Sequence, residues 1–168
     1  MEIRVLTAED AKAFYAHRLQ MLKDHPGAFA TSYEETKEEG MGQIVERLQS
    51  TGEKFTLGAF DGDRLVGSVG FLRQQRNKLR HKGFVMSMYT HPDIRRQGVG
   101  KALLENLLAR VRKLPSLEQI QLGVAVDNSA ARGLYASLGF EEFGREREAL
   151  KLPNRYVDEI HMVLKLKR

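Results

Sequence analysis

Apolar residues recur along the chain with two different periods, which predict where helices and strands lie. Between Val99 and Val111 they recur every three or four residues, as in an amphipathic helix. Between Ile120 and Val126 they alternate with other residues, as in a half-buried strand. The same patterns predict strands over 2–6, 55–60, 65–72, 84–90, 141–150 and 156–166, and helices over 8–24, 41–50 and 131–138.

Local signals fix several boundaries of these elements. Thr7 is a typical helix N-cap, with an acidic residue, Asp10, at the third helical position. The Asp61–Gly62 pair predicts a tight hairpin turn between two strands. Gly139 predicts a left-handed end of the last helix, which lets Phe140 pack back on that helix.

The order of these elements predicts an α/β (α+β mixed) protein. Hairpins alternate with two strand–helix–strand crossovers, which favours a mixed, mostly antiparallel sheet of about seven strands with helices on both faces. No linker, repeat or low-complexity segment interrupts the pattern, so residues 1–168 are expected to form one domain.

Composition narrows the functional classes. The chain has 27 Lys and Arg against 22 Asp and Glu, a formal net charge of +5, which suits an anionic partner. It has no cysteine, which excludes disulfides, thiolate metal sites and a cysteinyl acyl-enzyme. No segment resembles a signal peptide or approaches about 18 uninterrupted apolar residues, so we expect a cytoplasmic protein without a membrane partner.

The segment from Val85 to Leu104 is the richest in candidate chemistry. An apolar strand ends at His91–Pro92, and a glycine-containing basic turn leads directly into the amphipathic helix. Glycines let the backbone approach a ligand, and the free N–H groups of a first helical turn attract negative charge. Basic residues add to that charge at Arg95, Arg96 and Lys101. The residues alone therefore predict a cradle for phosphate or pyrophosphate.

Two common nucleotide motifs do not fit this segment. A P-loop would need glycine at position 95 and Ser or Thr at position 102, where the chain has Arg95 and Ala102. A dinucleotide fingerprint would need a third glycine at position 103, where the chain has Leu103.

A third pattern fits. After the strand and Pro92, the residues Arg95, Gly98 and Gly100 form an Arg-x-x-Gly-x-Gly sequence. A second group lies downstream at Asp127, Asn128, Ala131, Leu134, Tyr135, Leu138, Gly139 and Phe140. Both groups resemble the two motifs of the GNAT superfamily of N-acetyltransferases, and the order of elements resembles that fold over essentially the whole chain.

The resemblance implies roles for individual residues. The backbone of Gln97, Gly98, Val99, Gly100 and Lys101 would hold the pyrophosphate of acetyl-CoA, with Arg95 and Arg96 beside the phosphates. Met88, Tyr89 and Thr90 would pair their backbone with the pantetheine arm, and Asn128 would contact that arm or another part of the cofactor from the next turn. Tyr135 would lie near the thioester sulfur as the general acid.

The base that deprotonates the amine stays open. Met86, Ser87 and Met88 stand on the strand where many relatives carry a glutamate. A water chain, the segment 33–35 and His91 are the alternatives that the sequence offers.

The implied function is direct transfer of acetyl from acetyl-CoA to an amine in a ternary complex. The acceptor is a small-molecule or protein amine, and the superfamily does not identify it. The alternatives are a CoA-binding regulatory module with a degenerate site and an enzyme that uses another acyl-CoA. The resemblance also allows a homodimer, since terminal strands pair between chains in relatives of this fold.

Two further kinds of site are not expected. The five histidines have no metal-ligand spacing, so no metal is predicted. The basic run 73–82 lacks interleaved aromatic residues, so it is interpreted as a solvated loop and not as a nucleic-acid site.

Overall fold

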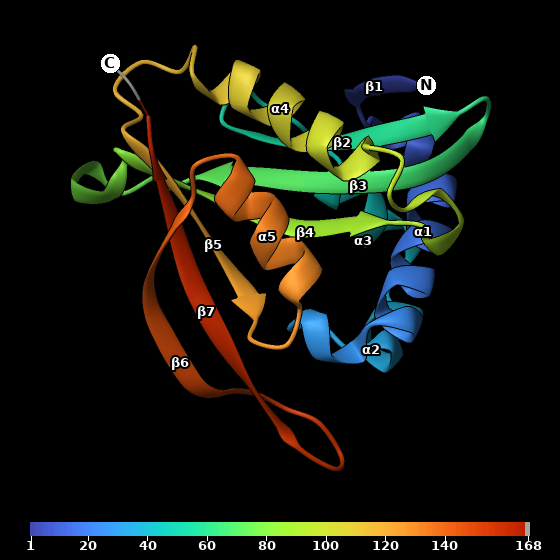
Figure 1. Ribbon diagram of the computed structural model, residues 1–168. Coiled ribbons are helices and arrows are strands. Elements are labelled where there is room, and N and C mark those ends of the chain that lie inside the picture. Colours follow the sequence, from blue (N-terminus) through green and yellow to red (C-terminus); the bar gives the residue numbers. More distant parts are fainter. Residues whose placement is uncertain (167–168) are drawn as a thin grey trace.

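Seven strands form one sheet in the computed structural model, which describes residues 1–166 (Figure 1). The strands are β1 (Glu2–Val5), β2 (Lys54–Asp61), β3 (Arg64–Arg73), β4 (Lys82–Thr90), β5 (Gln119–Ala125), β6 (Glu141–Lys151) and β7 (Tyr156–Lys165). Their order across the sheet is β1-β2-β3-β4-β5-β7-β6, and only β4 and β5 pair in parallel. The predicted mixed, mostly antiparallel sheet is confirmed.

Helices cover both faces of the sheet, as predicted. The α-helices are α1 (Ala11–Asp24), α2 (Tyr33–Glu38), α3 (Met41–Arg47), α4 (Val99–Val111) and α5 (Ser129–Ser137). Short 3-10 turns lie at Ala8–Asp10, Pro26–Ala28, Asn77–Leu79 and Pro92–Ile94. Figure 1 shows α4 and α5 in front of the sheet and the first three helices behind it. No helix within residues 1–166 has the length and apolar character needed to cross a membrane.

The sequence patterns located most boundaries but missed α2. The predicted helix over 99–111 coincides with α4, and the Thr7 amide donates to the Asp10 carboxylate at 2.8 Å, as a helix start requires. Gly139 has φ +100° and Phe140 N donates to the Tyr135 carbonyl, which confirms the predicted helix end. The unpredicted α2 is one and a half turns long and has no apolar period, but Ser32 and Glu35 cap its start reciprocally.

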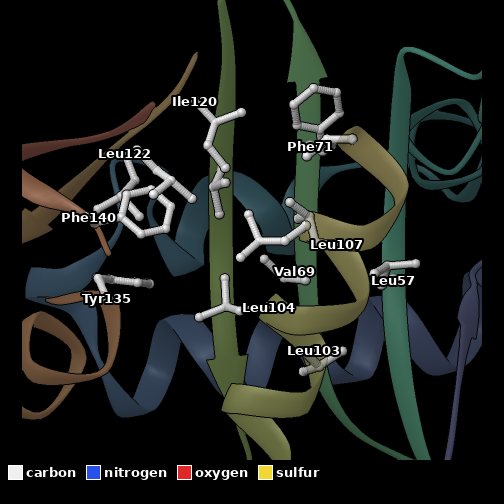
Figure 2. Close-up of a cluster of buried hydrophobic side chains, with 14 of the residues drawn as sticks. Leu57, Val69, Phe71, Leu103, Leu104, Leu107, Ile120, Leu122, Tyr135 and Phe140 are labelled. Carbon is white, nitrogen blue, oxygen red and sulfur yellow. The ribbon is translucent and has the colours of Figure 1, made fainter. Parts of the chain in front are cut away.

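The main core lies between the sheet and the α4–α5 layer. Figure 2 shows Leu103, Leu104 and Leu107 of α4 against β3 and β4. Tyr135 and Phe140 lie on the same face of the sheet, across β4 from these leucines. These five side chains are at most 6% exposed. Such burial stabilises each aliphatic side chain by about 2 kcal/mol, so the core fixes α4 and α5 firmly relative to the strands.

The sheet opens in its middle. Strands β4 and β5 pair only from Lys82 to Phe84, opposite Gln119 to Gln121, and pair no further although both continue. A bulge at Ser87, which has φ +55°, adds one residue to β4 relative to β3. From Val85 onward, β4 therefore presents an edge toward β5 that is free of strand pairing, and the gap beside it is where the candidate site lies.

Candidate active site

The turn into α4 has the backbone shape of an anion cradle. Arg96 and Gly98 both have positive φ, +64° and +80°, and Gly98 is the N-cap of α4. This conformation turns the chain sharply, so the first-turn N–H groups of Val99, Gly100 and Lys101 face the loop without intrahelical partners. A Cβ placed on Gly98 would meet no atom within 4 Å and would project into the open space over the loop.

The start of α4 lies close against β4. A Cβ on Gly100 would come within 3.0 Å of Met88 Cε, so glycine lets the helix approach the strand. Met88 and Thr90 are half-buried beside this contact. The loop and the free edge of β4 are thus adjacent.

Tyr89 points to the other face of the sheet. Its hydroxyl donates to Asp24 Oδ2 at 2.8 Å, and its ring lies 5.2 Å from the ring of His17. Burial raises the pKa of the Tyr89 phenol. Only the backbone of Tyr89 therefore faces the gap between β4 and β5.

The basic side chains around the loop are exposed, but they are not equivalent. Arg95 Nε donates to the Thr90 carbonyl at 3.1 Å, and Arg95 Nη2 lies 2.7 Å from His25 Nε2. Arg95 thus joins the end of β4 to the end of α1. Lys101 Nζ lies 3.8 Å from Glu105 Oε1, one turn along α4. Arg96 and Gln97 are exposed in the turn.

Asn128 is the N-cap of α5 and Tyr135 lies within this helix, which covers the gap from the α4 side. Asn128 Oδ1 accepts from Ala131 N at 3.2 Å and caps the helix. Tyr135 is 6% exposed and packs at 5.8 Å from the Phe140 ring. Its hydroxyl has no hydrogen-bond partner within residues 1–166. Burial raises the pKa of Tyr135 to about 12, so the phenol stays protonated at neutral pH.

Two of the base candidates from the sequence, His91 and Glu35, have other partners. His91 lies at the end of β4, where Nε2 is 3.1 Å from Arg64 and Nδ1 contacts Asp93. Glu35 accepts from the Ser32 amide at the start of α2.

A carboxylate that the sequence did not indicate borders the gap. Glu159 of β7 pairs with Ala125 of β5, and its side chain leans back over Gly123. Glu159 Oε1 lies 3.5 Å from the place where a Gly123 Cβ would be. Burial raises the pKa of Glu159. Because the β5 side chains on either side of Gly123, Leu122 and Val124, face the α5 core, Glu159 lies on the opposite face of β5 from Tyr135.

On the α1 face of the sheet, His17 forms a buried polar pair with Ser68 of β3. His17 Nε2 lies 3.0 Å from Ser68 Oγ, and both side chains are buried. Burial lowers the pKa of His17 to about 4.

This shift predicts a loss of stability in mild acid. The unfolded chain takes up a proton on His17 near pH 6.5 and the folded protein does not, so the free energy of unfolding falls as pH drops from 7 to 5. We expect a loss of about 2 kcal/mol over this range, measured by urea unfolding. The His17→Gln variant should show a flatter pH dependence, and His81→Gln should keep the wild-type slope. An unchanged slope in His17→Gln would contradict the assignment.

Within residues 1–166, no group of three or more His, Asp or Glu side chains is placed to hold a metal ion.

Comparison with known proteins identifies the family. The Acetyltransferase (GNAT) family matches residues 11–140, which include the α4 loop, Asn128 and Tyr135. The chain belongs to this family. An N-alpha-acetyltransferase of Sulfurisphaera tokodaii is 34% identical over 106 residues, 59% of this chain and 63% of the relative. The ribosomal protein bS18-alanine N-acetyltransferase of Escherichia coli is 40% identical over 73 residues, 44% of this chain and 49% of the relative.

Solved GNAT structures agree with the fold over its full length. A putative acetyltransferase from Salmonella typhimurium with its cofactor acetyl-CoA superposes with a TM-score of 0.81 at 20% identity. The match covers 100% of this chain and 95% of the other. The predicted GNAT-like fold is confirmed, whereas the curated relatives match the chain over no more than about two thirds of their own length.

Proposed function

We propose that this GNAT protein transfers the acetyl group of acetyl-CoA to an amine. The observation that carries the proposal is the adjacency of the α4 loop and the unpaired edge of β4. The loop offers backbone N–H groups and positive charge to a pyrophosphate, and the β4 edge offers backbone groups to an extended arm. A single linear molecule with phosphates at one end and amides along its length fits both.

Acetyl-CoA, when bound, supplies the thioester whose carbonyl carbon the amine attacks. The chain then has two proton-transfer groups on opposite faces of the gap. Tyr135, protonated and without a hydrogen-bond partner among the described residues, donates a proton to the leaving thiolate. Glu159 takes a proton from the incoming amine on the other face. An amine that enters from the α1 side meets the base first and leaves the sulfur on the acid side.

The direct experiment measures thiol release from acetyl-CoA over a panel of amines. Amine-dependent release supports the proposal, and the mass of the product shows which amine is acetylated. If CoA raises the melting temperature but no amine supports release, the protein is a CoA-binding module and not an enzyme. If neither CoA nor acetyl-CoA shifts the melting temperature, the cofactor assignment is wrong.

Two glycines with the same conformation provide a sharp test of the cradle. Gly98→Ala is expected to raise the KM for acetyl-CoA about 10-fold, because the new Cβ fills the space over the loop and strains its φ of +80°. Gly62→Ala is the matched control, since Gly62 also has positive φ and open space but lies in the β2–β3 turn. Each variant should lose about 1 kcal/mol of stability.

Steady-state kinetics and thermal unfolding separate the two effects. Equal melting temperatures with a KM change only in Gly98→Ala support the cradle. A KM that stays at the wild-type value in Gly98→Ala would refute it.

A further inference from the structure

A cavity of about 150 Å³ lies on the α1 side of the sheet, between α1 and strands β2–β4. Its walls are largely apolar, with Phe14, Phe55 and Met86 among them. A cavity of this size holds a molecule of about the volume of benzene. A small ligand therefore fits within it.

One buried cation, Arg18, faces this cavity without an ion pair to any carboxylate of the described residues. Glu39 attracts it only from beyond ion-pair distance. Arg18 of α1 is 6% exposed and lines the cavity. Its Nη2 donates to Thr31 Oγ1 at 3.3 Å, and its Nε is buried without any hydrogen-bond partner. No ion pair reaches Arg18 from the residues that the structure describes. A guanidinium has five N–H donors, so Arg18 has capacity for a ligand that accepts several of them.

The remaining charges around the cavity have the same sign. Arg47 and Lys54 also line it, and none of the Asp or Glu residues that the structure describes does. Arg47 is already paired with Glu39, at 2.7 Å. His17, with its lowered pKa, is uncharged at neutral pH. Because a buried charge is costly without a partner, an anionic group in the cavity would relieve the cost of burying Arg18.

The cavity also borders the candidate active site. Met86 and Ser87 of β4 form part of its wall, and they belong to the stretch of β4 whose other edge is free of strand pairing. The bulge at Ser87 lies at this junction. A ligand held by Arg18 would thus lie on the α1 face, next to the strand where the thioester is expected.

We propose that this cavity binds the acetyl acceptor, and that the acceptor is a small amine that also carries a carboxylate, such as a free α-amino acid. Arg18 holds the carboxylate, and the apolar wall holds the side chain. This inference rests on the proposed acetyltransferase function. In the reaction, the neutral amine nitrogen forms a bond to the acetyl carbon and the carbon–sulfur bond breaks. One amine proton is lost and the thiolate gains one, which gives the N-acetyl product and CoA thiol.

The test compares each free amino acid with its carboxamide, measured as thiol release by the full-length protein. The two acceptors differ in the charged group that Arg18 would bind and in the basicity of the amine, so kcat/KM is compared per concentration of neutral amine. For the best amino acid, kcat/KM should exceed that of its carboxamide by about 10- to 100-fold, as expected for loss of a charged hydrogen-bonded pair. Equal or better use of the carboxamide, or preference for the N-terminus of a short peptide, would overturn the proposal.

The Arg18→Gln variant tests whether Arg18 causes the preference for the amino acid over its carboxamide. It should raise the KM for the amino acid about 10- to 100-fold and leave the KM for the carboxamide within about 2-fold. Arg110→Gln is the control, because Arg110 is exposed on α4, on the opposite face of the sheet. Equal effects of Arg18→Gln on both acceptors would overturn the assignment. If that variant does not fold, the comparison of amino acid with carboxamide on the wild-type protein still tests whether the acceptor carries a carboxylate.

The same data separate failure of this inference from failure of the proposed function. The protein could acetylate amines that lack a carboxylate just as fast as amines that carry one. That result would reject the carboxylate site but support the acetyltransferase function. Absence of release with every amine rejects both.

Discussion

Replacement of Tyr135 by phenylalanine is expected to lower kcat about 100-fold, the lower end of what a general acid contributes. The phenol stays protonated up to its raised pKa of about 12, so it can donate to a thiolate throughout the neutral range. The substitution keeps the ring that packs on Phe140, so the fold and the KM for acetyl-CoA should change little.

Single-turnover measurement of thiol release reports the chemical step directly and avoids product release. Tyr156→Phe is the matched control, since Tyr156 is an exposed tyrosine on β7. It should retain the wild-type rate. A wild-type single-turnover rate in Tyr135→Phe would mean that the thiolate leaves without this proton, and that Tyr135 is a core residue only.

The sequence predicted the parts of the site that are local in the chain. Gly98, Gly100 and the helix that follows them lie in one continuous segment, so the motif can be recognised from neighbouring residues alone. The left-handed φ of Gly98 and the contact of Gly100 with Met88 are the physical reasons for that pattern. The same holds for Asn128, whose side chain caps the helix that carries Tyr135.

The parts that depend on pairing between distant segments were not visible in the sequence. The end of β4–β5 pairing after Phe84 is decided by segments about 35 residues apart. Arg18 is one of several polar residues of α1, and only packing against the sheet buries it. Glu159 reaches Gly123 through the β5–β7 register, and nothing in the residues around either position indicates it.

Replacement of Glu159 by glutamine is expected to lower kcat/KM at neutral pH about 100-fold and to remove the acidic limb of its pH profile. A carboxylate accepts a proton only when ionised, so the wild-type rate should rise with pH through the pKa of Glu159. Burial raises this pKa, which places the limb above the range of an ordinary glutamate. Glutamine keeps the size and polarity of the side chain but cannot take the proton.

A neighbouring carboxylate allows a second test of Glu159 as the base, because its removal should shift the pH profile in a known direction. Glu146, exposed on β6, contributes to the raised pKa of Glu159 by like-charge repulsion. Glu146→Gln should therefore shift the acidic limb to lower pH and leave the plateau rate unchanged, whereas Glu142→Gln, whose partner is Arg132, should not move the limb. A purely structural role of Glu159 would lower the rate in Glu159→Gln without removing the limb, and Glu146→Gln would then leave the profile in place. The pH profiles of the three variants thus distinguish a proton acceptor from a residue that only supports β5.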